Sequence, residues 1–118
     1  MERLKSNTDF SRVYQKGKYS ADRLVVVHYL PNQLEFSRFG FSVSKKIGNS
    51  VTRNLVKRRL RSIIQKLAPQ IRQGYDIVVS ARVGAQKADF LSLEKSVRHA
   101  IFRAFLFLKE DRGHERGN

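Results

Sequence analysis

The spacing of apolar positions along the chain predicts a series of helices and strands. Residues 7–16 place three side chains on one face of a short helix: Phe10, Val13 and Tyr14. Two stretches rich in β-branched or aromatic residues, 23–30 and 36–44, are typical of strands. Because only a short polar link separates them, we expect these strands to pair antiparallel. Gly40 within the second stretch indicates a bulge or a close backbone approach.

Three further elements follow along the chain. Residues 51–67 form an amphipathic helix with one apolar sector: Val56, Leu60, Ile63, Ile64 and Leu67. Residues 75–82 have an apolar centre that is typical of an interior strand, buried on both faces. A long helix is predicted over 92–109, with an apolar stripe of Leu93, Val97, Ala100, Ile101, Ala104, Phe105 and Leu108.

The order of these elements indicates the fold class. A helix between the second and third main strands predicts a parallel β-α-β crossover, and therefore a two-layer α+β or α/β sandwich. A short edge strand at 18–20 can extend the sheet. The charged residues 110–118, with two glycines, are predicted to form a frayed tail.

Length and composition exclude several classes of protein. A chain of 118 residues is expected to form one domain, spanning 1–118. An apolar fraction of 41% is too high for a disordered basic chain. The absence of cysteine excludes disulfides, cysteine-bound zinc and a thiol nucleophile. Neither a secretory signal nor a membrane span is visible, so we expect a cytoplasmic protein without membrane contact.

The charge balance indicates a polyanionic partner. The chain has 24 Lys and Arg against 10 Asp and Glu, a formal net charge of +14. No acidic residue occurs between Glu35 and Asp76, whereas ten cations do: Arg38, Lys45, Lys46, Arg53, Lys57, Arg58, Arg59, Arg61, Lys66 and Arg72. Nucleic acid explains this one-signed stretch best. A solvated basic face and an anionic membrane surface are the alternatives, although a membrane-bound helix favours Trp, which is absent.

The helix at 51–67 concentrates this charge on one flank. Arg53, Lys57 and Arg61 are spaced i, i+4 and i+8, which forms a ladder with steps of about 6 Å. Such like-charged pairs cost a few tenths of a kcal/mol each, which a bound polyanion would offset. Arg59 and Lys66 lie on the opposite flank and are interpreted as solubilising charges. The first turn carries no acid, so it can accept a phosphate or be satisfied by its cap and water.

The sequence shows no catalytic constellation. His28, His99 and His114 lack metal-ligand spacing, the acids are scattered, and no serine lies in a nucleophile motif. The chain is therefore predicted to bind rather than cleave. Phe10 and Tyr14 can stack on bases of a single strand or belong to the core, whereas we expect Phe39 and Phe41 to be core residues.

One long motif carries a family resemblance. Residues 41–54 read FSVSKKIGNSVTRN and resemble the signature of the bacterial ribonuclease P protein subunit. Further matching positions extend the resemblance over roughly residues 4–108: Asp9, Phe10, Val13, Tyr14, Gly17, Ala21, Arg23, Lys57, Arg58, Leu60, Arg61, residues 75–79, Ala81 and Arg82. The resemblance implies an α-β-β-β-α-β-α fold like the second domain of ribosomal protein S5, with a four-stranded mixed sheet and a left-handed β-α-β crossover.

The same resemblance implies a function. The family's protein subunit pairs with one catalytic RNA, which, with bound magnesium, removes the 5′ leader from precursor tRNA. The protein holds the leader and binds no metal or cofactor of its own. A ribosomal or general single-strand RNA-binding protein and a protein-only nuclease are the alternatives.

Site residues are transferred from the family position by position. The basic helix and the loop that leads into it would contact RNA through Lys45, Lys46, Asn49, Arg53, Asn54, Lys57, Arg58 and Arg61. The leader cleft would contain Phe10, Tyr14, His28, Ser42, Ser44 and Arg53. Two positions depart from the family pattern: Leu55 replaces the second arginine of an R-N-R triplet, and His28 stands where tyrosine is common.

Overall fold

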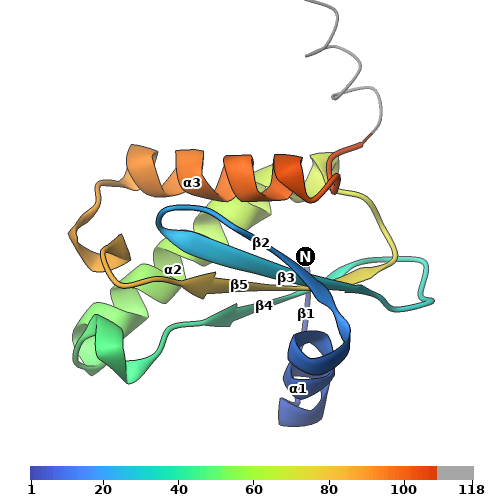
Figure 1. Cartoon of the computed structure of the whole chain (residues 1–118), viewed down its shortest axis with the longest axis horizontal. Helices are drawn as coiled ribbons and strands as arrows, with labels where there is room; N and C mark the ends of the chain where they lie inside the picture. Colours follow the sequence, from blue (N-terminus) through green and yellow to red (C-terminus); the bar gives the residue numbers. More distant parts are fainter. Residues whose placement is uncertain (109–118) are drawn as a thin grey trace, which may run out of the picture.

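A computed structural model describes residues 1–108, in which one sheet lies between helices on both faces (Figure 1). The described elements are β1 (Glu2–Arg3), α1 (Asn7–Lys16), β2 (Lys18–Ala21), β3 (Val25–Pro31), β4 (Arg38–Ser42), η1 (Lys45–Ile47), α2 (Ser50–Leu67), η2 (Ala68–Gln70), β5 (Tyr75–Ala81), η3 (Ala85–Lys87) and α3 (Phe90–Arg103). The predicted tail at 110–118 and the predicted last helical residue, Lys109, lie outside the described residues.

The sheet has the order β1-β4-β5-β3-β2. β5 lies at its centre, parallel to β4 and antiparallel to β3. This confirms both the interior strand and the parallel crossover through α2; the left hand of that crossover stays a prediction. The expected pairing of β3 with β4 is wrong, because β5 lies between them. β5, which has four consecutive buried residues, takes the position where both faces of the sheet are covered.

The expected count of four strands is also wrong. β1 adds a fifth strand, parallel to β4, and the Leu4 amide donates to the Phe39 carbonyl at 2.9 Å just beyond it. Two residues are too few for an alternating pattern to show. The predicted edge strand at 18–20 is present as β2, one residue longer.

The main core lies between the sheet and the pair α2 and α3. Phe39 and Phe41 are buried in it, which confirms their assignment to the core. From α2 it takes the five residues of the predicted apolar sector: Val56, Leu60, Ile63, Ile64 and Leu67. The side of α2 that faces away from this apolar sector remains on the surface.

α1 packs on the other face of the sheet, below it in Figure 1. A second apolar cluster holds it there, formed by Leu4, Val13 and Val78, with Phe10 and Leu30 packed against them. The Phe10 ring lies directly on the backbone of Gly40, where an added Cβ would come within 2.5 Å of Phe10 Cζ. The predicted close approach at Gly40 is therefore confirmed, and it fixes the position of α1.

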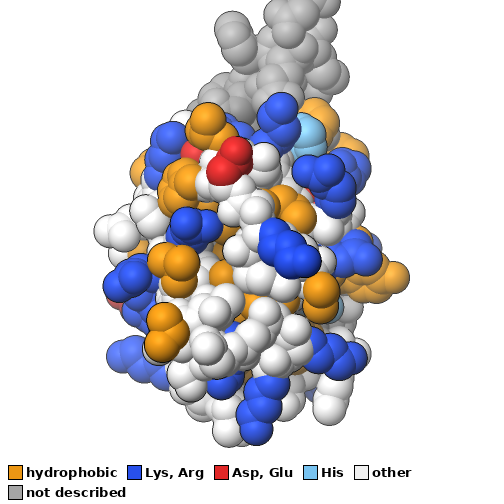
Figure 2. Space-filling view, turned by 90° about the vertical axis from the view of Figure 1, so that its left-hand side faces the viewer, with side chains coloured by type: hydrophobic (Ala, Val, Ile, Leu, Met, Phe, Trp, Pro, Cys, Tyr) orange, Lys and Arg blue, Asp and Glu red, His pale blue; other side chains and the backbone are white. Residues whose placement is uncertain are grey.

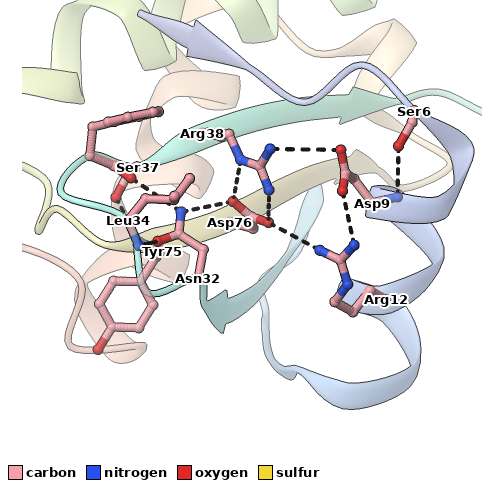
Figure 3. Close-up of polar contacts among 10 residues, drawn as sticks. Ser6, Asp9, Arg12, Asn32, Leu34, Ser37, Arg38, Tyr75 and Asp76 are labelled. Atoms are coloured by element: carbon pink, nitrogen blue, oxygen red, sulfur yellow. Dashed lines mark hydrogen bonds and ion pairs between the residues drawn. The ribbon is translucent and has the colours of Figure 1, made fainter.

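A buried carboxylate also fixes α1 (Figure 3). Asp76 on β5 is 1% exposed and accepts from Arg38 Nε at 2.8 Å and Nη2 at 2.7 Å. Arg38 reaches Asp9 of α1 at 3.8 Å, and Arg12 reaches Asp9 at 3.1 Å and Asp76 at 3.9 Å. The hydrogen bond that Arg38 donates to Asp76 raises the pKa of Arg38, so this cation stays charged and links helix to sheet.

Several predicted boundaries need correction. The strands expected at 23–30, 36–44 and 75–82 are observed at 25–31, 38–42 and 75–81, so no end differs by more than two residues. α3 begins at Phe90 rather than residue 92, because the Asp89 side chain caps it by accepting from the Ser92 amide at 2.8 Å. It ends at Arg103: Phe105 has φ +60° and is 63% exposed, so the predicted stripe fails at that residue.

Candidate nucleic-acid interface

A row of residues that pair across the strands forms the floor of the candidate site. Tyr19 on β2 pairs with His28 on β3, His28 with Val78 on β5, and Val78 with Gly40 on β4. Because side chains alternate along a strand, these four positions face the side of the sheet on which α1 lies. α1 packs over β5 and β3, and its Phe10 ring reaches Gly40 of β4.

Phe10 and Tyr14 come from α1, and the structure leaves both accessible. Phe10 is half-buried against Gly40, whereas Tyr14 is 41% exposed. The Tyr14 ring meets the His28 ring edge-on, with centroids 4.7 Å apart, and its hydroxyl lies 3.2 Å from Ser80 Oγ. The predicted cleft aromatics are therefore held in place at the surface and not sealed in the core.

His28 lies between two tyrosines. Its ring centroid is 4.7 Å from that of Tyr14 and 5.9 Å from that of Tyr19. Burial lowers the pKa of His28, so the imidazole is neutral at neutral pH. Its Nδ1 is buried and has no hydrogen-bond partner within residues 1–108. A neutral ring of this kind presents an aromatic face without a fixed charge.

Ser42 and Ser44 connect the sheet to the basic segment. Ser42 is half-buried and pairs in register with Ser80, the residue that contacts Tyr14. The chain then leaves β4, passes the exposed Ser44 and enters η1 with the exposed Lys45 and Lys46. The serine row of the sheet thus lies at the end where the β4–α2 loop begins.

The start of α2 is capped from within this loop. Asn49 Oδ1 accepts from the Thr52 amide at 2.9 Å, so this predicted RNA-binding residue serves as the helix cap. Arg53 in the first turn donates from Nε to the Gly48 carbonyl at 3.1 Å. The structure therefore brings Tyr14 and His28 into direct contact and places Phe10 on the same face of the sheet over Gly40, whereas Arg53 contacts the β4–α2 loop.

Four acids of residues 1–108 form ion pairs, all away from the predicted RNA-binding cations: Asp9, Asp22, Asp76 and Glu94. Their ion pairs involve Arg12, Arg38, Lys66, Arg98 and Arg103. Within the same range, no ion pair involves any member of what we call the basic flank: Lys45, Lys46, Arg53, Lys57, Arg58 and Arg61. Figure 2 shows the end of the molecule where α2 begins, with Lys and Arg side chains spread over it and few acidic ones.

Arg59 and Lys66 lie apart from the basic flank, as predicted, but both make contacts that their interpretation as solubilising charges did not include. Lys66 Nζ contacts Glu94 Oε2 of α3 at 3.0 Å, and Arg59 Nη1 donates to the Ala88 carbonyl at 3.3 Å. Both cations therefore attach α2 to neighbouring structure.

On the basic flank and at the adjacent Asn54, exposure varies. Asn54 and Arg58 are exposed, Lys57 and Arg61 are half-buried, and Arg61 Nε is buried with no partner in the described chain. Leu55 is 39% exposed, outside the core as expected.

The sequence analysis missed two residues of this surface. Ser80 contacts Tyr14, and Tyr19 continues the row of rings beyond His28. The alternation of β5 could have placed Ser80 on the face of Val78, but Tyr19 depended on knowing the pairing of β2. Within residues 1–108, no cluster of three or more His, Asp or Glu side chains could hold a metal ion, and no helix is long and apolar enough to span a membrane.

A mixed sheet with accessible rings on its α1 face, together with a basic flank on α2 that has no acidic partner in residues 1–108, is typical of a nucleic-acid-binding α+β domain. The family model described as Ribonuclease P matches residues 1–104. The ribonuclease P protein component of Caldanaerobacter subterraneus subsp. tengcongensis is 43% identical over 95% of this chain and 97% of its own length. That of Clostridioides difficile is 40% identical over 85% and 89%. The chain belongs to the ribonuclease P protein family.

Solved structures agree with this assignment. The ribonuclease P protein of Staphylococcus aureus has a TM-score of 0.84 and 38% identity, covering 92% of this chain and 99% of that one. A Staphylococcus aureus mutant described as defective in mRNA degradation activity has a TM-score of 0.83 and 39% identity over 89% of each chain. The Thermotoga maritima protein, in complex with a thiourea, has a TM-score of 0.77 and 31% identity, covering 82% and 94%.

Proposed function

We propose that this chain is the protein subunit of a cytoplasmic ribonuclease P, bound one-to-one to the catalytic RNA, where it holds the 5′ leader of precursor tRNA. Family membership supports the role in tRNA 5′ processing. Two observations carry the leader role: Phe10 and Tyr14 are accessible on the α1 face of the sheet, and the basic flank has no acidic partner in residues 1–108.

The aromatic residues and the basic flank have different roles in the proposed complex. Bases of an extended leader stack on Phe10, Tyr14 and the neutral ring of His28, each stacked base contributing about 1–3 kcal/mol. Ser42 and Ser44 offer hydroxyls at the edge of the cleft. The basic flank neutralises phosphates of the leader and of the catalytic RNA, which lowers the repulsion between the two strands.

Cleavage is assigned to the partner. In the proposed complex the RNA would hold magnesium, and that ion would supply the activation of water for hydrolysis of the phosphodiester. The described residues contain no acidic cluster suited to that ion. The chain's own contribution is to bind and orient the leader, so its effect should appear in substrate affinity and in the magnesium concentration that cleavage requires.

Reconstitution with the catalytic RNA at low magnesium tests this function. We expect the wild-type chain to stimulate cleavage of precursor tRNA, and Phe10→Ala or Arg53→Ala to weaken precursor binding at least fivefold, the loss of about one stacked base or phosphate contact. Binding of mature tRNA should stay unchanged. Lys66→Ala is the matched control, because Lys66 contacts Glu94 and not the cleft. Equal losses for both tRNAs would refute the leader role.

Two control reactions address the alternatives. A general RNA-binding protein would bind the single strand but give no stimulation of the catalytic RNA. A protein-only nuclease would cleave precursor tRNA with magnesium and no added RNA, and the mRNA degradation activity ascribed to the Staphylococcus aureus relative makes this control necessary. We expect no cleavage by the chain alone.

A further inference from the structure

Tyr19 is an exposed aromatic side chain on the edge strand of the sheet. It is 68% exposed, more than either ring of α1, and it belongs to β2, at the end of the order β1-β4-β5-β3-β2. A tyrosine that served only to cover the sheet would bury more of its ring, since burial of apolar area is what stabilises such packing. Its exposure leaves a large ring surface available to a ligand.

The Tyr19 ring continues the line of rings in the cleft. Its centroid lies 5.9 Å from that of His28, which in turn lies 4.7 Å from that of Tyr14. The underlying positions form one cross-strand row, from Gly40 beneath Phe10 through Val78 and His28 to Tyr19. With strands about 4.8 Å apart, this row crosses about 14 Å of the sheet.

We propose that Tyr19 extends the leader cleft across the edge strand, as a stacking position for a nucleotide farther from the cleavage site than those on Phe10 and Tyr14. The proposal rests on the proposed leader role and adds to it a specific length of bound strand. Aromatic stacking accepts any base, so the site takes single-stranded RNA without a strong sequence preference.

The positive charge near Tyr19 is compatible with single-stranded RNA as the ligand. Lys16 at the end of α1 and Lys18 next to Tyr19 are exposed, and neither forms an ion pair with an acid of residues 1–108. Because side chains alternate along a strand, Lys18 lies on the opposite face of β2 from Tyr19, so Lys16 is the cation of this pair that a phosphate beside the stacked base could meet. A protein segment laid along the edge would instead pair with the free backbone of β2, and the exposed ring would add little to that contact.

Precursor tRNAs whose leaders grow one nucleotide at a time test the proposal, with the holoenzyme reconstituted from the catalytic RNA and this chain. We expect wild-type affinity to rise about fivefold or more at one leader length, and Tyr19→Ala to lose that rise while binding shorter leaders normally. Tyr19→Phe should keep it. Phe36→Ala, which removes a 42% exposed ring from the β3–β4 loop, is the matched control.

A second readout locates the contact directly. Leaders that carry one 5-iodouridine at successive positions should crosslink to the Tyr19 peptide at a position farther from the cleavage site than the crosslink to the Tyr14 peptide. Identical leader-length curves for Tyr19→Ala and wild type, or an equal loss at every length, would overturn the proposal. If Phe10→Ala still weakens precursor binding, only the extension fails; if Phe10→Ala has no effect either, the leader role itself fails.

Discussion

His28 combines a half-buried structural position with the binding role that we propose for it. The rings of Tyr14 and Tyr19 flank it, and its buried Nδ1 lacks a partner within residues 1–108. Burial favours the neutral form, because a charged imidazole would lose hydration without gaining an acidic neighbour. The residue is therefore suited to stacking at neutral pH and is penalised when it is protonated.

This penalty predicts a pH dependence of stability. The pKa of His28 in the folded chain lies below its ordinary value of 6.5, so the unfolded chain binds more protons as the pH falls below about 6.5. The stability that neutral His28 contributes to the folded chain is fully present above that pH and is lost as the pH falls through the lowered pKa. Urea unfolding from pH 7.5 to 5.5 should show a steeper loss of stability for wild type than for His28→Tyr. Parallel curves would contradict the prediction.

At the scale of one element, the two flanks of α2 differ in role: one attaches the helix to the rest of the fold, and the other is the proposed RNA contact. Lys66 and Arg59 attach the helix to α3 and to the Ala88 carbonyl, and the apolar sector faces the core. The hydrogen bond from Lys66 lowers the pKa of Glu94, which keeps that carboxylate charged and in place. The other flank keeps Lys57 and Arg58 without an acidic partner in the described chain, so it is available for phosphates.

The two flanks predict different responses to salt. Lys57→Gln should reduce the slope of log K against log[salt] for holoenzyme assembly by about 0.7, the effect of one phosphate contact on single-stranded RNA. Lys66→Gln should leave that slope unchanged, although it removes an ion pair with Glu94. Filter binding between low and moderate salt measures both. A slope change of equal size in the two variants would show that the flanks are not functionally distinct.

For the whole molecule, the positions of the acidic residues decide which surface stays positive, which the net charge of +14 alone does not show. Asp9 and Asp76 hold α1 to the sheet, Glu94 joins α2 to α3, and Asp22 contacts Arg103 at 2.6 Å. The hydrogen bond from Ser6 lowers the pKa of Asp9, so this carboxylate remains ionised in its network. The acids thus stabilise the fold, and they leave the recognition surface positive.

Self-repulsion of that surface predicts opposite salt effects on the free and bound chain. Raising NaCl from 0.01 to 0.15 M shortens the screening length from about 30 to about 8 Å. The Tm of the free protein should rise, because repulsion among unpaired cations weakens. The extra stability that the catalytic RNA confers should fall over the same range, because binding weakens. A free protein whose Tm is constant or falls would contradict this account.

The sequence by itself determined those features that depend on neighbouring residues. Periodicity gave α1 and the core face of α2, the apolar centre of β5 gave the interior strand, and the motif at 41–54 gave the family. Tertiary structure decided the pairing of β5 between β3 and β4, because strands compete for the covered centre of the sheet. It also decided where α3 ends. It also decided the contacts of Tyr14 with Ser80 and of His28 with Tyr19, since these residues come from different elements and no local pattern links them.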